Sequence, residues 1–317
     1  MRAKSIAVWN PASASFFKTL TRQIWRYRVV YLLLLPGLIY FAVFKYGPLY
    51  YAQIAFKDFK PILGVEGSPW IGLQNFQTFV NSYYFGQLLQ NTIIISVAKL
   101  IFGIPPAIIL ALALSETRFL KLGRVVQTVS YLPHFLSWVV MFGILLAMLS
   151  PSEGLVNKAI GGTGAQPIAF LTSPDWFRAV IVGSDIWKDT GWGAIIYLAA
   201  LLAIDPTLHE AASIDGANRL QRIWHIALPS IKEVIILVTL LRLGTILDAG
   251  FSQIFIIYSL PVYSVGDVID TWVYRQGILN FQFGLAAAVG IFKGVIGLVL
   301  IVVANRAAKR VAGSGLY

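Results

Sequence analysis

Long apolar stretches alternate with shorter polar stretches along the chain. Each apolar stretch is close to the roughly 20 residues that a helix needs to cross the hydrocarbon core of a membrane. Pro36 and the pair Pro105 and Pro106 lie inside such stretches, where we expect kinks that neighbouring helices support. The pattern predicts an all-α, polytopic membrane protein with six membrane-spanning helices, at residues 29–52, 88–114, 126–149, 179–203, 231–258 and 283–304.

Lys and Arg residues are unevenly distributed between the segments that join these predicted spans. Fifteen fall in the two terminal segments, in loop 115–125 and in loop 204–230 with Lys232 at its edge, whereas five fall in the loops on the other side. Cytoplasmic loops of membrane proteins are enriched in Lys and Arg. The bias therefore predicts that both termini are cytoplasmic.

This topology divides the chain into three parts. Residues 1–28 are predicted to form a cytoplasmic N-terminal tail, and residues 305–317 a cytoplasmic C-terminal tail. Residues 29–304 between them form the transmembrane domain, which includes the cytoplasmic loop 204–230.

The composition excludes a soluble globular domain. The 317 residues are 57% hydrophobic and only 12% charged, whereas soluble domains are about 45–50% apolar and about 25% charged. The chain has no cysteine, which excludes disulfides, thiolate metal sites and cysteine nucleophiles. A net charge of +11 would suggest nucleic acid in a soluble protein. In a membrane protein the cytoplasmic loops account for it, so we expect no nucleic-acid partner.

Motifs for catalysis, metal binding and nucleotide binding are missing from the sequence. No G-x-x-x-x-G-K-[ST] motif is present, so the chain has no P-loop to hold ATP phosphates. His134, His209 and His225 are far apart, without an H-E-x-x-H motif. We therefore expect no catalytic residue, metal or cofactor on this chain. His134 is open to two interpretations: contact with a transported ligand, or a hydrogen-bonded structural role.

The polar stretch HEAASIDGANRLQRIWHIALP separates the fourth and fifth predicted spans. The pair Asp205–Pro206 before it favours a helix start, and Thr207 and Glu210 have the spacing of a capping box. These signals predict a short helix over 207–215, which Gly216 ends because glycine readily adopts a positive φ angle. ANRLQRIWHIAL then predicts a second helix. By its pattern alone, this could be a solvated amphipathic loop at the membrane surface.

A family resemblance adds a more specific interpretation of this loop. Its fixed positions and their spacing, E-A-A, three residues, G, nine residues, I-A-L-P, resemble the signature loop of permease subunits in bacterial binding-protein-dependent ATP-binding cassette (ABC) importers. FKYGPLYYAQIAFKDF, PWIGLQNFQTF, YLPHFLSWVV and DIWKDTGW are similar to the sugar-permease branch for oligo- and polysaccharides. Many members of that branch have methionine and glycine where this chain has Leu49 and Tyr51, which weakens the transfer of a substrate.

The resemblance implies the type I ABC importer permease fold and an assembly in the bacterial cytoplasmic (inner) membrane. Helix 207–215 would be a coupling helix seated on an ATPase subunit, with Glu210 facing a cation and Gly216 making the bend. The implied partners are a second, homologous permease subunit in a heterodimer, two cytoplasmic ATPases that bind ATP and Mg, and an extracytoplasmic solute-binding protein. The residues assigned to ATPase coupling are Glu210, Ala211, Ala212, Asp215, Gly216, Leu228 and Pro229.

Polar and ionisable residues inside the predicted spans indicate a hydrated passage, because charges at membrane depth usually face the bundle interior or a water-filled path. In the alternative interpretation they pair with one another, for instance Lys188 with Asp185 or Asp189. The cations exceed what a neutral sugar requires, which suggests an acidic, uronate-type saccharide. Lys99 has no evident partner in the sequence. The residues assigned to the passage are Trp187, Lys188, Asp189, Trp192, Arg242, Thr245, Asp248 and Lys293.

The sequence thus favours the permease subunit of an ATP-driven saccharide importer that works by alternating access. A permease of the same type for a non-sugar solute is one alternative. An ion-coupled secondary transporter is another, although no inverted repeat is evident. A membrane-embedded enzyme would need a clustered acid and base set, and the carboxylates here are scattered.

Overall fold

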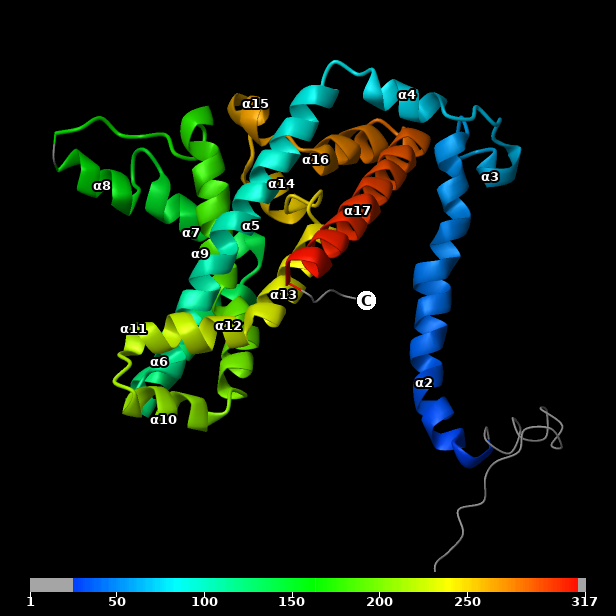
Figure 1. The fold of residues 1–317 in the computed structure, drawn as a ribbon. Coiled ribbons are helices and arrows are strands. Elements are labelled where there is room, and N and C mark those ends of the chain that lie inside the picture. The colour runs from blue at the N-terminus through cyan, green and yellow to red at the C-terminus, as the bar shows by residue number, and fades with distance from the viewer. Residues whose placement is uncertain (1–24, 163, 313–317) are drawn as a thin grey trace, which may run out of the picture.

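The computed structural model describes residues 25–162 and 164–312, and this part of the chain is almost entirely helical (Figure 1). It contains no β-strand, only an isolated bridge between Lys57 and Trp70. Most of the predicted N-terminal tail and the end of the predicted C-terminal tail lie outside the described residues.

The long helices are α2, α5, α9 and α17, and shorter helices join them. Three of the short segments are π-helical turns, at Ala42–Tyr46, Ile223–Ala227 and Arg275–Leu279, and three are 3₁₀ helices, at Gly47–Phe56, Leu132–Phe135 and Leu260–Val262. The α-helices are α2 (Arg28–Phe41), α3 (Gly64–Gly67), α4 (Gln74–Val80), α5 (Phe85–Ser115), α6 (Leu120–Tyr131), α7 (Trp138–Leu149), α8 (Leu155–Gly161), α9 (Pro174–Leu202), α10 (Pro206–Ile214), α11 (Arg219–Arg222), α12 (Leu228–Ser230), α13 (Lys232–Gly244), α14 (Phe251–Ile257), α15 (Tyr263–Gly266), α16 (Ile269–Tyr274) and α17 (Phe283–Ala312).

Helices α5 and α9 pack along each other in the centre of the bundle (Figure 1). One buried cluster joins their outer halves to α7 and α14, around Phe177 and Ile254. A second joins their inner halves to α12 and α13, around Tyr197 and Ile231. A third joins α5 to α4, α16 and α17. Close van der Waals packing in these clusters holds the bundle around the α5–α9 pair, because lipid tails are as apolar as the packed side chains and give no hydrophobic driving force between the helices.

Among residues 25–162 and 164–312, three helical segments are long and apolar enough to cross a membrane as single helices: Arg28–Phe56, Phe85–Ser115 and Phe283–Arg310. They agree with the first, second and sixth predicted spans. Pro36 and the pair Pro105 and Pro106 lie inside helices that continue past them. Helix α9 agrees with the fourth predicted span, and it leads into α10 through a bend of 70°.

The prediction of one continuous third span over 126–149 is wrong. The helical chain turns by 108° between Phe135 and Trp138. Leu136 is extended, and the Ser137 hydroxyl caps α7 by accepting a hydrogen bond from the Val140 amide at 3.3 Å. The apolar run hides this break, because hydropathy records composition and not the direction of the backbone.

The prediction of one continuous fifth span over 231–258 is also wrong. Helix α13 ends at Gly244, and α14 begins at Phe251. Gly250 between them has φ +90°, a left-handed conformation that side-chain-bearing residues rarely adopt. Thr245 and Asp248, which the sequence places inside a continuous fifth span, therefore lie in the interruption between the two helices.

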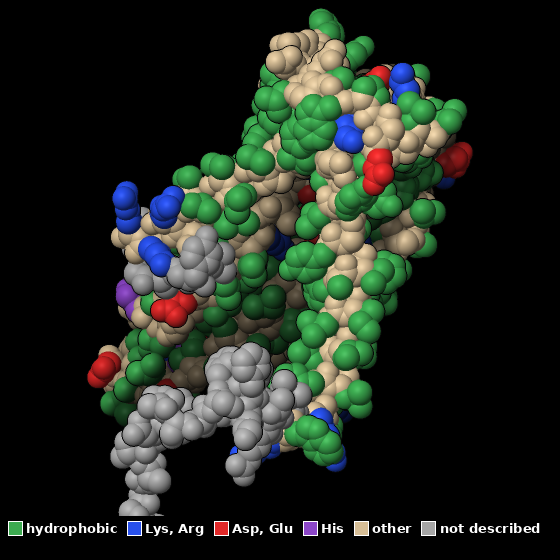
Figure 2. Space-filling view, turned by 90° about the vertical axis from the view of Figure 1, so that its right-hand side faces the viewer, with side chains coloured by type: hydrophobic (Ala, Val, Ile, Leu, Met, Phe, Trp, Pro, Cys, Tyr) green, Lys and Arg blue, Asp and Glu red, His purple; other side chains and the backbone are tan. Residues whose placement is uncertain are grey.

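Helix α2 stands apart from the bundle (Figure 1), and none of its residues is buried. Its continuation, the 3₁₀ helix Gly47–Phe56, packs on α17 and anchors it at one end. Figure 2 looks onto the side that carries α2, where hydrophobic side chains cover most of the surface between charged groups near the two ends. An apolar helix that the described part of its own chain leaves unburied needs lipid or another protein around it.

Candidate coupling loop and polar cavity

The helix predicted over 207–215 is confirmed as α10, Pro206–Ile214. Its N-cap is Asp205, whose carboxylate accepts a hydrogen bond from the Thr207 amide at 2.9 Å. This bond lowers the pKa of the Asp205 carboxyl below its usual range. The predicted capping box of Thr207 and Glu210 is wrong, because Asp205 occupies the cap and shifts the position that Glu210 would have to take.

Helix α10 ends in a Schellman motif, which makes the predicted bend at Gly216. Gly216 has φ +81°. The Ala217 amide donates to the Ala212 carbonyl at 2.9 Å, and the Gly216 amide donates to the Ser213 carbonyl at 3.2 Å. These two bonds satisfy carbonyls at the helix end. Asp215 is the residue just before the glycine.

A second helical segment returns from this bend, as predicted. It begins with a capping box in which Asn218 and Gln221 bond each other's amides, at 2.9 and 2.7 Å. The N-x-x-Q spacing could have revealed this box from the sequence. Arg222 in this segment donates a hydrogen bond to the Ser213 hydroxyl on α10. The two arms of the loop are thus tied to each other before any partner binds.

The outer surface of α10 is free for contact with another protein. No residue of α10 is buried in this chain, and its small Ala211 and Ala212 allow close approach of another surface. Within the described residues, Glu210 takes part in no ion pair. The other predicted coupling residues, Leu228 and Pro229, form the short helix α12 at the far end of the loop.

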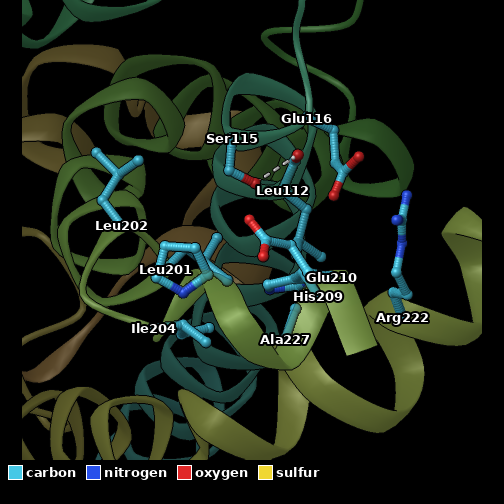
Figure 3. Close-up of a pocket in the computed structure, with 11 residues that line it drawn as sticks. Leu112, Ser115, Glu116, Leu201, Leu202, Ile204, His209, Glu210, Arg222 and Ala227 are labelled. Atoms are coloured by element: carbon cyan, nitrogen blue, oxygen red, sulfur yellow. Dashed lines mark hydrogen bonds between the residues drawn. The ribbon is translucent and has the colours of Figure 1, made fainter. Parts of the chain in front are cut away.

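A cavity of about 420 Å³ lies between this loop and the ends of α5 and α9. Glu116 at the end of α5, Glu210 on α10 and Arg222 on the returning arm all line it (Figure 3). Apolar residues such as Leu112, Leu201 and Ala227 form its inner wall (Figure 3). Residues of the loop, of α5 and of α9 therefore line the same cavity.

A second, polar cavity of about 300 Å³ lies at the interruption between α13 and α14. It brings together four of the residues predicted for the passage, Asp189, Arg242, Thr245 and Asp248, although the helix expected to align the last two is broken. The other charged residues of its lining are Lys99 and Asp185, which the sequence did not assign to the passage.

Lys99 on α5 holds the walls of this polar cavity together. Its ammonium lies 2.9 Å from the Asp185 carboxylate on α9. It donates to the Ala249 carbonyl at 3.1 Å and to the side-chain oxygen of Gln253. Gln253 is fully buried and donates to the Ile181 carbonyl at 2.8 Å and to Ser184. The φ angle of +90° at Gly250 favours glycine, and a Cβ atom there would lie 2.6 Å from the Lys99 ammonium, which would have to shift.

Lys188 does not enter the polar cavity, contrary to its assignment to the passage. It is 8% exposed and donates hydrogen bonds to three backbone carbonyls, of Pro133 at 3.1 Å, His134 at 2.5 Å and Leu136 at 2.7 Å. These carbonyls are released where the helical chain turns between α6 and α7. The alternative prediction that Lys188 pairs with an aspartate is wrong as well.

The predicted aromatic residues lie outside the lining of the polar cavity. Trp192 stacks on His134 with ring centroids 4.5 Å apart and an angle of 2° between the planes. His134 Nδ1 lies 2.9 Å from an Asp189 carboxylate oxygen, which is the hydrogen-bonded role that one interpretation of the sequence gave it. Trp187 is 46% exposed.

Lys293 on α17 pairs with Asp270 on α16. Both residues line a third cavity, of about 450 Å³, which shares Asp248 with the polar cavity. Lys293 is therefore paired within this chain, and it lines this neighbouring cavity and not the polar cavity.

The Lys99–Asp185 pair gives a stability prediction. Lys99→Met leaves the Asp185 carboxylate without its ion-pair partner, so we expect the free energy of unfolding in detergent to fall by about 2 kcal/mol. The Asp185 side chain is 19% exposed, which keeps the loss below the full cost of an isolated buried charge. The matched control is Lys60→Met, which breaks an exposed pair with Asp58 of 3.6 Å and should cost below about 1 kcal/mol. Equal losses would contradict a structural role for Lys99.

Residues 103–313 match the family model for a "Binding-protein-dependent transport system inner membrane component". The polygalacturonan/rhamnogalacturonan transport system permease protein YteP of Bacillus subtilis (strain 168) is 41% identical over 300 residues, covering 95% of this chain and 94% of YteP.

Two solved structures are also similar to this chain. One is a bacterial ABC transporter involved in the import of the acidic polysaccharide alginate, with a TM-score of 0.85, 39% identity and coverage of 93% of this chain and 99% of that chain. The other is a bacterial alginate ABC transporter in complex with an alginate pentasaccharide-bound periplasmic protein, with a TM-score of 0.85, 38% identity and the same coverage.

Proposed function

Because the chain belongs to the family of binding-protein-dependent transport system inner membrane components, we propose that it is the membrane-spanning permease subunit of an ATP-driven saccharide importer. It is a multi-pass inner-membrane protein with the helical fold of an ABC importer permease. In this proposal it does not hydrolyse ATP. Two cytoplasmic ATPase subunits bind ATP and Mg.

The observation that carries this proposal is the exposed, internally braced loop of α10, Gly216 and the returning arm. Asp205 and the Schellman motif fix both ends of α10, and Arg222 fixes the returning arm against it. A rigid projection of this kind can transmit a push without deforming. Closure of the ATPases around ATP would move this loop as a rigid body, and α5 and α9 would rotate with it. This rotation would change the side of the membrane to which the passage is open. By linkage, delivery of cargo would bias the ATPases toward closure.

A second, distinct permease subunit completes the membrane part of the assembly in this proposal. Helix α2 has no buried residue in its own chain. On α17, a Cβ atom added at Gly290 or Gly294 would meet nothing within 4 Å, so this face is also open to another helix. An extracytoplasmic solute-binding protein delivers the cargo in this proposal; the similar alginate transporter was solved in complex with an alginate pentasaccharide-bound periplasmic protein.

The topology follows from the Lys and Arg distribution. Residues 1–28 and 305–317 are assigned to the cytoplasm as the terminal tails, and loop 204–230 lies on the same side, where it can meet the ATPases. Residues 29–304 form the permease domain. Helix α17 continues to Ala312, so its last turns project into the cytoplasm in this arrangement.

The cargo is an oligo- or polysaccharide, and acidic saccharides belong to the proposed range. YteP is named for polygalacturonan and rhamnogalacturonan, and the similar solved transporter for the acidic polysaccharide alginate. The polar cavity supports this assignment, because hydroxyl groups of sugars need hydrogen-bonding partners at membrane depth. Asp189, Thr245 and Asp248 supply such groups in its lining.

A permease of the same type for a non-sugar solute is the remaining competitor, since the family description names no cargo. Ion-coupled secondary transport is set aside, because family members work with a binding protein. Identification of the ligand of the associated binding protein separates the two cargo classes.

Co-purification tests the proposal. The tagged chain, expressed with the products of its neighbouring genes, should recover an ATPase whose hydrolysis is stimulated by the loaded binding protein. A double variant, Glu210→Ala with Gly216→Ala, should abolish that stimulation while the chain stays in the membrane. Saccharide uptake that persists without any ATPase would refute the proposal.

A further inference from the structure

The cations at membrane depth differ in how they are neutralised. Lys99 and Lys293 form ion pairs with carboxylates, and the Lys188 ammonium donates hydrogen bonds to three backbone carbonyls. Arg242 on α13 is the exception: within the described residues, no hydrogen bond or ion pair to its guanidinium is found. An arginine without a partner in a membrane-spanning segment is costly, and such residues usually face a ligand path.

The guanidinium of Arg242 lies at the wall of the polar cavity, against the two central helices. A Cβ atom added at Gly103 on α5 would lie 3.3 Å from Nη1, and one at Gly193 on α9 would lie 3.8 Å from Nη2. Both neighbours are glycines without side-chain donors or acceptors. The side chain is half-buried and lines the cavity, so its charge is available there.

Nearby groups leave this charge without a partner. Asp248 lines the same cavity, but within the part of the chain that the structure describes its carboxylate accepts a hydrogen bond only from the Gly250 amide, at 3.3 Å. A planar guanidinium in this situation can bind a carboxylate through two parallel hydrogen bonds.

We propose that Arg242 is the residue that selects acidic saccharides, by binding the carboxylate of a uronate unit as it passes through the polar cavity. This inference rests on the proposed function and narrows it. It assigns charge selection to one side chain and removes Lys188 and Lys293, which are neutralised internally, from that role.

The test uses two cargoes of the same length that differ in charge: trigalacturonate and its fully methyl-esterified, neutral form. Uptake into proteoliposomes is measured with the complete importer, and each cargo is supplied at a concentration that saturates the binding protein. Wild type should favour the acid. Arg242→Gln should reduce uptake of the acid about tenfold to a hundredfold, the range for loss of hydrogen bonds to a charged group, and leave uptake of the ester close to wild type.

Three variants sharpen this result. Arg242→Lys keeps the charge but loses the paired geometry, so it should retain an intermediate preference. Gly103→Ala pushes the guanidinium while keeping its charge, and it should weaken the preference too. Lys60→Gln, which removes an exposed positive charge away from the cavity, should leave the preference unchanged.

The outcomes separate the inference from the proposed function. If wild type carries acid and ester equally, or if Arg242→Gln lowers uptake of both alike, saccharide import stands and selection by Arg242 is wrong. If Asp248→Asn has the same effect as Arg242→Gln, and exchange of the two residues restores uptake, the two side chains are structural partners and the inference is also wrong. If neither saccharide is carried by wild type, the saccharide assignment fails and the inference fails with it.

Discussion

Replacing Glu210 with arginine is expected to lower ATP-driven uptake at least about a hundredfold, while the chain still reaches the membrane and binds its partner permease. Glu210 is exposed on α10 and has no ion-pair partner in the described part of its own chain. Its charge is therefore available for a cation on the ATPase. Truncating one member of a charge pair that becomes buried at an interface costs about 2–5 kcal/mol, and each 1.4 kcal/mol is a factor of ten. A reversed charge adds repulsion to this loss.

The measurements are uptake, ATPase stimulation by loaded binding protein, and recovery of the ATPase on the tagged permease. Glu233→Arg is the matched control, because Glu233 is an exposed acid at the start of α13, outside α10. It should retain both uptake and ATPase recovery. Normal uptake by Glu210→Arg would mean that α10 does not meet a basic surface of the ATPase.

Lys188→Met is expected to destabilise the protein by about 3 kcal/mol or more. The three carbonyls that Lys188 binds lie at the turn between α6 and α7. Each buried polar group that loses its partner costs about 1–3 kcal/mol, and water cannot easily replace a buried ammonium there. The measurement is unfolding of the purified chain in detergent, together with the yield of protein in the membrane.

Two controls separate this role from cargo binding. Lys232→Met removes an exposed lysine from the start of α13 and should cost little. Lys188→Arg, which keeps a charged donor, should recover part of the stability. In the fraction of Lys188→Met that folds, the preference for acid over ester should match wild type. If Lys188→Met lost that preference without losing stability, Lys188 would instead contact the cargo in the passage.

Local rules were sufficient for the coupling loop. An aspartate followed by proline starts a helix, and a glycine ends it, through contacts within a few residues of the chain. The helix over 207–215 and the bend at Gly216 could thus be predicted from the sequence and are found in the structure. The wrong capping box shows the limit of such rules. Both Asp205 and Thr207 are residues that cap helices, and local rules did not indicate that Asp205 is the N-cap.

Hydropathy was sufficient for the membrane class and for the continuous helices. A run of about 20 apolar residues cannot remain in water at low cost, whatever its neighbours are. This reasoning located α5 and α17 and the helical segment 28–56 correctly. Hydropathy does not reveal the interruptions after Phe135 and Gly244, because a change in the direction of the backbone leaves the composition of the segment unchanged.

The sequence by itself determined the membrane class, the long helices, and the helix and bend of loop 204–230, since these depend on composition and on contacts between near neighbours. The tertiary structure alone decided which intramembrane charge is neutralised. Lys188 meets carbonyls some fifty residues away, Lys99 meets Asp185 and the broken segment before α14, and Arg242 is left facing the cavity. Charges separated widely along the chain interact only through space, so no spacing in the sequence reveals which of them finds a partner.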